Sequence, residues 1–326
     1  MKKILCIQPL HPAALRVLDE RTDVTYEIVT DFSTDNLLRH VRDADAITVR
    51  DAPLPVEVLQ AAPNLQVISR HGVGYDNIPV EYCTVRGIPV TIVGNVNSNS
   101  VAEHTLYLML AVARSGIRQD ATVRTGKFTE RSVIPCFELR GRKLLVIGYG
   151  RIGQEVALRA ASFGMEIVVY DPFARQEHFP GVVFVSSLDD ALVQADITTL
   201  HVPLMPETRN LIGARELALM PAGAVVINSS RGGIVDEDAL AESIKSGHLR
   251  GAGLDTFAIE PLPTHSPLLS EQNIVLSPHS AALSTEALIG MGVMTVNNAL
   301  AGLDGTLNPE LVVNRSVLKE VSYASK

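Results

Sequence analysis

An arginine, a glutamate and a histidine each stand just after a short β-branched run in the second half of this 326-residue sequence. They are Arg231, Glu260 and His279, and the runs before them are AVVINSS, GAGLDTF and NIVLS. Parallel sheets bind ligands beyond the carboxyl ends of their strands, so these side chains are expected to meet in one place. An imidazole can donate a proton near neutral pH, a carboxylate can favour its charged form, and a guanidinium can bind a carboxylate. The set therefore suits the reduction of a carbonyl group, in which negative charge develops on oxygen.

Each of the three residues also has a simpler interpretation when it is taken alone. Arg231 precedes two glycines and can be an exposed turn residue. Glu260 precedes Pro261 and can be a loop acid, and His279 can stand at the start of a helix. The catalytic hypothesis depends on the three acting together, with His279 as proton donor, Glu260 beside it and Arg231 clamping a substrate carboxylate and carbonyl oxygen.

The stretch VIGYGRIGQEV contains three glycines, Gly148, Gly150 and Gly153, between an apolar run and a helical pattern. Taken alone, this spacing is compatible with a tight turn. Here it follows the run KLLVIG and opens a helix, whose free amides can bind a pyrophosphate. The next run ends in Asp171, at the spacing of a carboxylate that binds ribose hydroxyls and repels a 2′-phosphate. The sequence therefore predicts NAD as cofactor rather than NADP, although Arg175 can either pair with a phosphate or remain a surface residue.

A second glycine loop, SRHGVGYDNI, follows an apolar run in the first half of the chain. Gly72 and Gly74 would let consecutive backbone amides form an anion-binding nest for the same substrate carboxylate. The alternative is a plain turn between a strand and a helix. The loop taken alone does not decide between the two.

Apolar runs alternate with helical patterns along most of the chain. The first hundred residues contain five such runs: KKILCI, VTYEIV, AITVR, LQVISR and PVTIV. From Lys143 onward there are six more: KLLVIG, EIVVYD, ITTLHVP, AVVINSS, GAGLDTF and NIVLSPH. Runs separated by helices are typical of parallel strands covered on both faces. We therefore expect an α/β fold with two doubly wound parallel sheets of Rossmann-like type.

A long helix is predicted between the two sets of runs, over NSNSVAEHTLYLMLAVARSG. Ser100 and Glu103 are expected to form a capping box at its start, and Gly116 to stop it. A last helix, near residues 283–302, should return the chain to the first unit. We expect a discontinuous substrate-binding domain, 1–99 with 296–326, an NAD-binding domain, 100–295, and a cleft between them.

Composition and charge argue against several classes of protein. The formal net charge is −8, so nucleic acid has little electrostatic reason to bind. Cys6, Cys83 and Cys136 are odd in number and scattered, which fits a reducing compartment, and the cytoplasm is expected. The stretch LYLMLAVA is shorter than a membrane span, and the start MKKILCIQPL is too short for a secretory signal. The sequence has neither a GxSxG elbow nor an HExxH motif, so neither a serine hydrolase nor a metal site is expected.

Seven stretches occur in the order found in the D-isomer-specific 2-hydroxyacid dehydrogenase family, which the sequence resembles over nearly its whole length. They are HGVGYDNI, NSVAEHT, GYGRIG, HVPLMPETRNLI, INSSRGGIVDEDAL, GAGLDTFAIEPLP and SPHSAALSTEA. The resemblance implies that Arg231, Glu260 and His279 are the catalytic arginine, acid and proton donor. It also implies that the amides of Val73 and Gly74 hold the carboxylate of a small 2-oxo or 2-hydroxy acid.

The resemblance further implies a set of contacts to NAD. The glycine loop, with Arg151 and Ile152, would contact the pyrophosphate, and Asp171 the ribose. The remaining contacts would come from Val202 and Pro203 along the nucleotide, from Ser229, Ser230 and Arg231 near the nicotinamide, and from Asp255 at the carboxamide.

Within the family, the sequence has features of two branches. Arg50, Arg70 and the stretch GKFTERS resemble phosphoglycerate dehydrogenases, and Arg50 with Arg131 can bind a substrate phosphate if both reach the cleft. SPHSAALSTEA instead resembles hydroxypyruvate and glyoxylate reductases. The resemblance implies a homodimer formed through SVAEHTLYLMLAVAR, and we expect no effector control through a C-terminal regulatory domain. One alternative function is an NAD-sensing corepressor with little turnover, as found among some relatives of this fold.

Overall fold

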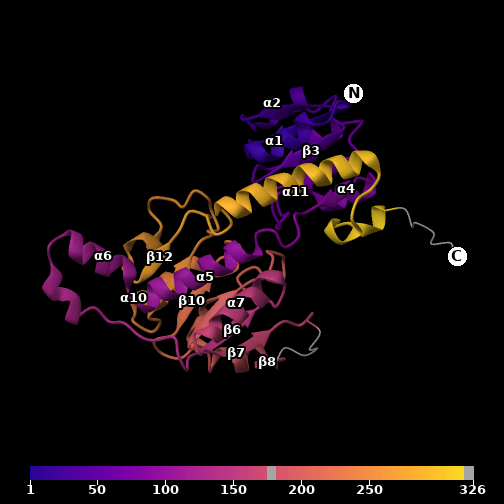
Figure 1. Cartoon of the computed structure of the whole chain (residues 1–326). Coiled ribbons are helices and arrows are strands. Elements are labelled where there is room, and N and C mark those ends of the chain that lie inside the picture. Colours follow the sequence, from indigo (N-terminus) through magenta and orange to yellow (C-terminus); the bar gives the residue numbers. More distant parts are fainter. Residues whose placement is uncertain (175–180, 319–326) are drawn as a thin grey trace. The chain divides into compact units, whose positions relative to one another are not determined.

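The computed structural model describes residues 1–174 and 181–318, and the chain divides into two compact units (Figure 1). Unit 1 comprises Met1–Asn97 and Ser284–Lys326, and unit 2 comprises Ser98–Leu283. The second division therefore falls between residues 283 and 284, rather than at the predicted 295/296. The physical reason is that the last long helix packs along its whole length with elements of unit 1. Each unit is described by itself below.

Unit 1 is built on a five-stranded parallel sheet, as predicted. The sheet order is β2-β1-β3-β4-β5, which is a doubly wound order with its switch point between β1 and β3. The central strands are buried on both faces, which explains why their sequences are continuous apolar runs. The strands are β1 (Lys2–Ile7), β2 (Val24–Val29), β3 (Ala46–Val49), β4 (Val67–Arg70) and β5 (Val90–Thr91).

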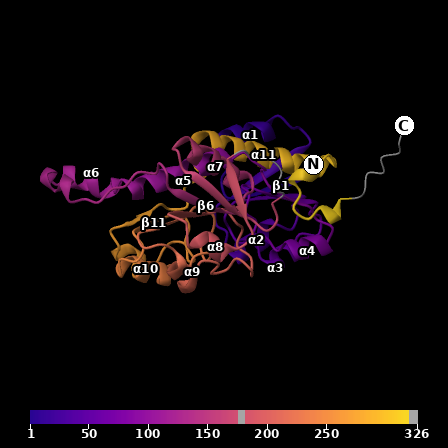
Figure 2. The ribbon, with the colours of Figure 1, turned by 90° about the horizontal axis from the view of Figure 1, so that it is seen from below.

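Five helices cover the two faces of this sheet. Figure 2 shows α1 and α11 on one side, with α2, α3 and α4 on the other. They are α1 (Pro12–Asp19), α2 (Thr34–His40), α3 (Val56–Gln60), α4 (Val80–Val85) and α11 (Thr285–Asp304). A Cβ atom on Gly302 of α11 would lie 2.5 Å from Val67, so glycine lets this helix press against β4. Two 3-10 turns, η3 (Pro309–Leu311) and η4 (Arg315–Val317), follow, and the amide of Val313 donates to the carbonyl of Val90.

Unit 2 contains a seven-stranded parallel sheet in the order β12-β11-β10-β9-β6-β7-β8. The prediction of six strands was wrong by one, because β8 was missed. β8 is a four-residue edge strand whose side chains are half-buried or exposed, and its sequence, VVFV, is a short β-branched apolar run that the prediction did not count. The strands are β6 (Lys143–Ile147), β7 (Glu166–Tyr170), β8 (Val182–Val185), β9 (Ile197–Leu200), β10 (Val225–Asn228), β11 (Gly251–Leu254) and β12 (Ile274–Leu276).

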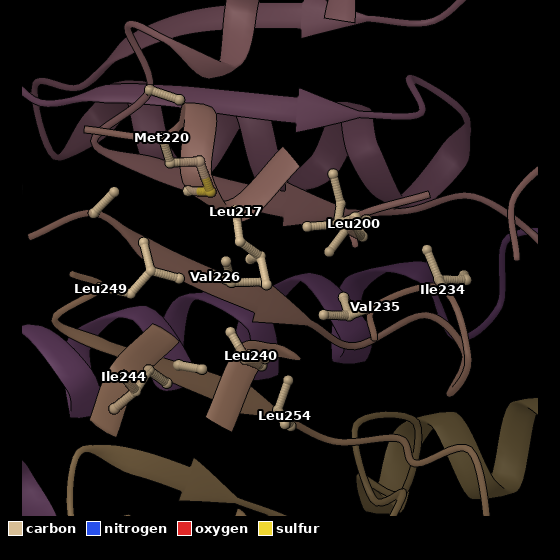
Figure 3. Close-up of a cluster of buried hydrophobic side chains, with 14 of the residues drawn as sticks. Leu200, Leu217, Met220, Val226, Ile234, Val235, Leu240, Ile244, Leu249 and Leu254 are labelled. Carbon is tan, nitrogen blue, oxygen red and sulfur yellow. The ribbon is translucent and has the colours of Figure 1, made fainter. Parts of the chain in front are cut away.

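The helices of unit 2 pack on both faces of its sheet. On one face α9 and α10 bury Leu217 and Leu240 against Leu200, Val226 and Leu254 of the strands (Figure 3). On the other face α5 and α7 pack against each other and the sheet. The helical segments are α5 (Ser98–Ala113), α6 (Gly116–Arg124), η1 (Phe128–Ser132), α7 (Arg151–Ser162), α8 (Leu188–Leu192), α9 (Ala214–Leu219), α10 (Glu237–Lys245) and η2 (Pro267–Ser270). Among the described residues, no helix combines the length and apolarity needed to cross a membrane.

Helix α5 differs from its prediction at both ends. It begins at Ser98, so Ser100 lies inside the helix and the predicted capping box is wrong. Ser100 Oγ donates instead to the carbonyl of Ala281 at 2.7 Å, and Glu103 accepts from Asn99 Nδ2. Gly116 does not stop the helix either, because α6 begins there after a left-handed residue at 115. The polar pattern at the start of α5 therefore serves tertiary contacts.

Candidate active site

The switch point of the unit 2 sheet lies between β6 and β9. From β6 the strand order continues to β7 and β8 on one side, and from β9 it continues to β10, β11 and β12 on the other. Ligands bind at such points in open α/β sheets. Gly148 follows β6 with a φ of +89°, and a Cβ atom there would lie 2.6 Å from the carbonyl oxygen of His201 and 2.8 Å from Val202. Glycine is therefore required for the loop after β6 to approach the loop after β9. Pro203 continues this second loop, and its carbonyl accepts from Thr208 Oγ1.

The other two glycines of the loop have different surroundings. A Cβ atom on Gly153 would lie 2.1 Å from the carbonyl oxygen of Gly148, so the first turn of α7 packs on the loop itself. Gly150 caps α7 without a side chain, and a Cβ atom there would meet no atom within 4 Å. The amides of Arg151 and Ile152 begin the helix beside this open space. A helix N-terminus with room in front of it fits the pyrophosphate of a dinucleotide.

Asp171 directly follows β7, and three backbone amides fix its carboxylate. Tyr149 N donates to Oδ2 at 2.7 Å, while Phe173 N and Ala174 N donate to Oδ1 at 2.8 and 3.1 Å. A carboxylate can accept about four hydrogen bonds, so acceptor capacity remains for a ribose hydroxyl. The residues present therefore fit NAD. Arg175, which sequence analysis placed near this carboxylate, lies outside the described residues.

The histidine and the glutamate of the predicted set are in contact. His279 Nδ1 lies 2.8 Å from Glu260 Oε2, and the side chains are 39% and 38% exposed. The hydrogen bond to Glu260 raises the pKa of His279 above its ordinary value, against the opposing effect of burial. Burial by itself raises the pKa of Glu260, but the hydrogen bonds from His279 and Phe257 N bring it below its usual value. The pair therefore favours an imidazolium beside a carboxylate.

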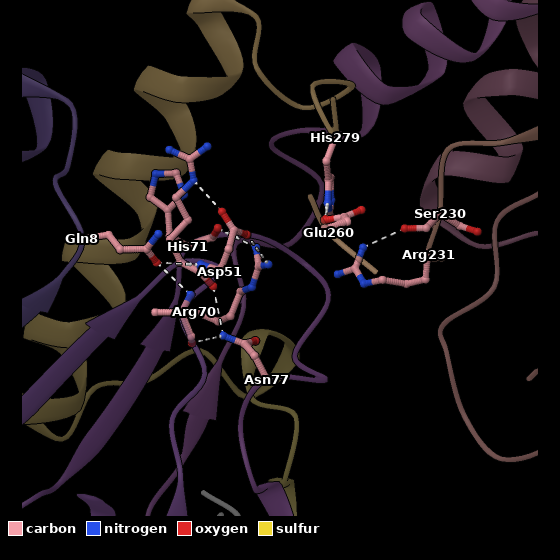
Figure 4. A network of polar contacts seen from close by, with 11 residues as sticks. Gln8, Asp51, Arg70, His71, Asn77, Ser230, Arg231, Glu260 and His279 are labelled. Atoms are coloured by element: carbon pink, nitrogen blue, oxygen red, sulfur yellow. Dashed lines mark hydrogen bonds and ion pairs between the residues drawn. The ribbon is translucent and has the colours of Figure 1, made fainter. Parts of the chain in front are cut away.

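Arg231 lies in the loop after β10, close to this pair (Figure 4). Asn228 fixes the loop, because its Nδ2 donates to the carbonyl of Arg231 and its Oδ1 accepts from the amide and hydroxyl of Ser230. A Cβ atom on Gly232 would lie 1.9 Å from the carbonyl of Phe257, so the loop packs directly on the backbone after β11. The positive charge of Arg231 helps to lower the pKa of Glu260, and it also lowers the pKa of His279, against the larger raising effect of Glu260. The structure thus brings the three predicted residues together.

Asp255 follows β11 and is fully buried. Oδ1 accepts from Ser277 Oγ at 2.6 Å and from Ser280 N at 2.8 Å, and Oδ2 accepts from Ala281 N at 2.9 Å. Burial raises its pKa, but the hydrogen bond from His104 and these three donors lower it overall. The carboxylate is therefore committed largely to the loop around His279, and its expected contact with a carboxamide stays a prediction.

Ser229 lies in the loop after β10, beside Asn228 and Arg231, and is almost fully buried. Its Oγ lies 2.6 Å from Thr105 Oγ1, whose own proton goes to the carbonyl of Val101. Ser229 therefore donates to Thr105, which leaves the Ser229 oxygen with acceptor capacity only. This property suits an N–H donor such as a carboxamide.

Unit 1 holds the other predicted binding residues. Asp51 contacts both arginines: Oδ2 lies 3.0 Å from Arg50 Nε and Oδ1 lies 3.3 Å from Arg70 Nη2. Gln8, at the end of β1, accepts from the amides of Asp51 and Ala52 through Oε1 (Figure 4). Sequence analysis missed Asp51, although its place after β3 and beside Arg50 is the same signal that identified the other polar residues. The cluster lies at the switch point of the unit 1 sheet.

The glycine loop after β4 is shaped by Arg70. Gly72 has a φ of +146°, and a Cβ atom there would lie 1.5 Å from Arg70 Nη1, which donates to the carbonyl of His71. Burial lowers the pKa of His71 to about 4, so its ring is neutral near pH 7. Val73 and Gly74 follow and are half-buried. Gly72 is thus required by the guanidinium that sequence analysis assigned to the substrate.

The last predicted residue, Arg131, belongs to η1 of unit 2. It is exposed, and its guanidinium carbon lies 4.9 Å from the centroid of the Phe128 ring. Its role in phosphate binding stays a prediction. Within residues 1–174 and 181–318, no group of three or more His, Cys, Asp or Glu side chains is arranged to hold a metal ion.

Comparison with known proteins decides the family. Residues 106–281 match the model of the D-isomer specific 2-hydroxyacid dehydrogenase family, NAD binding domain. The chain belongs to this family. Unit 2 contains the region that matches the NAD binding domain of this family, and the two parallel-sheet α/β units match the fold of the family.

Individual relatives cover most of the chain. It is 42% identical over 317 residues to D-3-phosphoglycerate dehydrogenase of Methanocaldococcus jannaschii, covering 96% of this chain but only 60% of that relative's length. It is 38% identical over 327 residues to glyoxylate reductase of Thermofilum pendens, covering 97% and 96% of the two chains. The structure of D-lactate dehydrogenase from Aquifex aeolicus complexed with NAD and lactic acid matches with a TM-score of 0.85, 29% identity and coverage of 95% and 99%.

Proposed function

We propose that this protein is an NAD-dependent oxidoreductase that interconverts a small D-2-hydroxy acid and its 2-oxo acid. The observation that carries the proposal is the contact of His279 with Glu260, beside Arg231, in the NAD-binding domain of a 2-hydroxyacid dehydrogenase. Each part of the chemistry has a residue suited to it. When bound at the glycine loop and Asp171, the nicotinamide cofactor would supply the hydride for the carbonyl carbon of the oxo acid, or would accept it in the reverse direction.

In the proposed mechanism, His279 moves the proton. In the direction of reduction, imidazolium Nε2 donates a proton to the carbonyl oxygen as negative charge develops there. Glu260 holds Nδ1, which fixes the ring and favours its charged form before the transfer. In the direction of oxidation, the neutral ring accepts the hydroxyl proton. The nearby carboxylate then stabilises the imidazolium that forms.

Arg231 is proposed to orient the substrate. Its guanidinium can fork onto a carboxylate and the adjacent carbonyl oxygen, which holds the reacting carbon in one position. The amides of Val73 and Gly74 in unit 1, with Gly72, are proposed to bind the same carboxylate. The Ser229 oxygen, Ser230 and Asp255 are proposed to lie near the nicotinamide, and Val202 and Pro203 along the nucleotide.

Two substrate classes fit the binding residues of unit 1. Arg50 and Arg70 both contact Asp51, and a guanidinium group can bind a substrate phosphate through two parallel hydrogen bonds. A phosphorylated acid would agree with the name of the Methanocaldococcus relative, and glyoxylate or hydroxypyruvate with that of the Thermofilum relative. We propose an acid of one of these classes.

A homodimer in the cytoplasm completes the proposal, although α5 is a poor candidate for its interface. Ten of its sixteen residues are buried. Tyr107 of α5 is exposed, and four further exposed apolar side chains follow on α6 and beyond, at Ile117, Val123, Phe128 and Val133. This surface is the proposed dimer contact. Three free cysteines, two of them buried, fit a reducing compartment.

The function is tested by NADH consumption with glyoxylate, hydroxypyruvate, 3-phosphohydroxypyruvate, pyruvate, 2-oxoglutarate and branched 2-oxo acids. One preferred substrate whose turnover collapses in His279→Ala supports the proposal. NADPH serves as the cofactor control. Tight NADH binding without turnover of any acid would contradict it and favour an NAD-sensing binding protein.

A further inference from the structure

Helix α5 contacts both ends of the turn that carries His279. Near the N-terminus of the helix, Ser100 Oγ donates to the carbonyl of Ala281 at 2.7 Å. One helical turn later, His104 Nε2 lies 2.8 Å from Ser277 Oγ. The two side chains are four residues apart and therefore lie on the same face of the helix. All of these residues belong to unit 2.

The interior of the turn is organised by Asp255. Its carboxylate accepts from Ser277 Oγ and from the amides of Ser280 and Ala281, and its carbonyl accepts from His279 N at 2.7 Å. One buried residue thus holds the side chain of Ser277 and the backbone amides at and after His279 by hydrogen bonds. Since Ser277 and Ala281 are also the contacts of α5, the helix and Asp255 fix the same turn from two directions.

The directions of these hydrogen bonds follow from counting hydrogens. A serine hydroxyl has one hydrogen, and Ser277 gives it to the Asp255 carboxylate at 2.6 Å. Ser277 can therefore only accept from His104, so Nε2 of His104 carries a hydrogen. The same nitrogen lies 3.4 Å from Asp255 Oδ1, which favours this arrangement further. His104 therefore contributes to the turn as the N–H donor to Ser277 Oγ.

The turn needs this support because of the conformation of His279. Its φ is +52°, in the left-handed region that residues other than glycine rarely adopt. Such a conformation persists where the surroundings over-determine it. We propose that Ser100 and His104 are positioning residues, which hold the Ser277–Ala281 turn so that His279 stays aligned with Glu260. This inference rests on the proposed function, in which His279 moves the proton.

The packing of α5 explains how a helix can serve this role. A Cβ atom on Gly253 of β11 would lie 2.8 Å from Leu108 Cβ, so glycine lets α5 press closely on the sheet. The helix is therefore held at a fixed height over the strand ends. The His104 ring also lies near that of Tyr107, with ring centroids 5.4 Å apart and the planes tilted by 46°. A substitution at His104 can preserve this ring contact while it removes the donor.

The experiment compares matched variants of the full-length protein. His104→Phe keeps a ring but has no donor, His104→Gln restores an N–H donor, and Ser100→Ala removes the contact at the other end. Glu103→Gln, an exposed neighbour on the same helix, is the control. We would measure kcat, the Kd for NADH by fluorescence and folding by circular dichroism. The pKa of His279 would be measured by NMR with labelled histidine, its signal being assigned by its loss in His279→Gln.

We expect kcat to fall by roughly ten- to hundred-fold in His104→Phe, because a small misplacement of a reacting group costs this much. Ser100→Ala should act in the same direction, while His104→Gln and Glu103→Gln stay near wild type. The pKa of His279 should fall in the two impaired variants, since its contact with Glu260 loosens while burial and the charge of Arg231, which both lower this pKa, remain. NADH affinity and folding should be preserved.

Two results would overturn the inference. One is an unchanged kcat and an unchanged pKa of His279 in both His104→Phe and Ser100→Ala. The other is a folded His104→Gln protein that is as impaired as His104→Phe, because the donor would then be irrelevant. A wild-type protein without turnover would contradict the proposed function instead, and the NMR comparison would still decide whether α5 positions His279.

Discussion

Glu260 contacts His279 through Nδ1 of the ring, so proton exchange with a substrate would take place at Nε2. His279→Ala should lower kcat by roughly 10²- to 10⁴-fold, the usual contribution of general acid–base catalysis. The Kd for NADH should stay near wild type. The measurement is steady-state turnover together with NADH fluorescence titration, and His265→Ala, at an exposed histidine of the same unit, is the control. A fall in NADH affinity equal to the fall in kcat would point to a binding role.

The same contact predicts how activity depends on pH. Reduction requires the imidazolium, so kcat/KM for the oxo acid should fall as pH rises through the pKa of His279, which lies above its ordinary value. Oxidation of the hydroxy acid requires the neutral ring and should rise over the same interval. Glu260→Gln removes the main cause of the raised pKa, so both profiles should move to lower pH. Profiles that do not move would show that another group titrates.

Substitution of two glycines of the nucleotide loop should have different effects, one on stability and one on NADH affinity. Gly153→Ala places a methyl group 2.1 Å from the Gly148 carbonyl and should reduce the free energy of unfolding by about 1–3 kcal/mol. Gly150→Ala meets no atom of the protein within 4 Å, so its stability should be unchanged. Its methyl group would nevertheless occupy the space in front of α7, so NADH affinity should fall. Thermal unfolding and NADH titration separate the two effects, and equal stability losses would contradict this difference.

Asp171 should control the choice between the two nicotinamide cofactors. In Asp171→Ala the acceptor for the ribose hydroxyls is lost, which should weaken NADH binding by roughly 10- to 100-fold, as expected for hydrogen bonds to a charged group. NADPH binding should improve or stay constant, because the repulsion of its 2′-phosphate is removed. The ratio of kcat/KM values with NADH and NADPH is the measurement. An unchanged ratio would mean that the carboxylate only holds the amides of residues 149, 173 and 174.

The apolar side chains of α6 should decide the oligomeric state. Replacing Ile117 and Val123, which are 59% and 61% exposed, by aspartate should convert the proposed dimer into a monomer of 35.1 kDa. Sedimentation velocity measures this directly. Glu103→Gln serves as the control on the neighbouring helix. A double variant that stays dimeric would place the interface elsewhere.

The sequence predicted the strands, the glycine loop and the three polar residues at strand ends because each depends on local pattern and on the rule for parallel sheets. Contacts between distant segments were less accessible. Ser100 followed by Glu103 is a good capping pattern, yet its partner, Ala281, lies far along the chain. The contact of Asp51 with Arg70 requires that β3 pairs with β4, and no local sequence pattern specifies this pairing. β8 was missed although its sequence, VVFV, is an apolar run of the same kind as those of the other strands.

The return of the chain to unit 1 has a consequence for its synthesis. Val67 of β4 is covered by α11, which begins at Thr285, so the part of this face that α1 does not cover stays exposed until α11 has left the ribosome. Unit 2 is continuous in sequence and can complete its core earlier. Limited proteolysis of stalled nascent chains ending before and after α11 would show the order of protection. We expect unit 2 to become resistant to the protease first. Unit 1, although its synthesis begins earlier, should become resistant last.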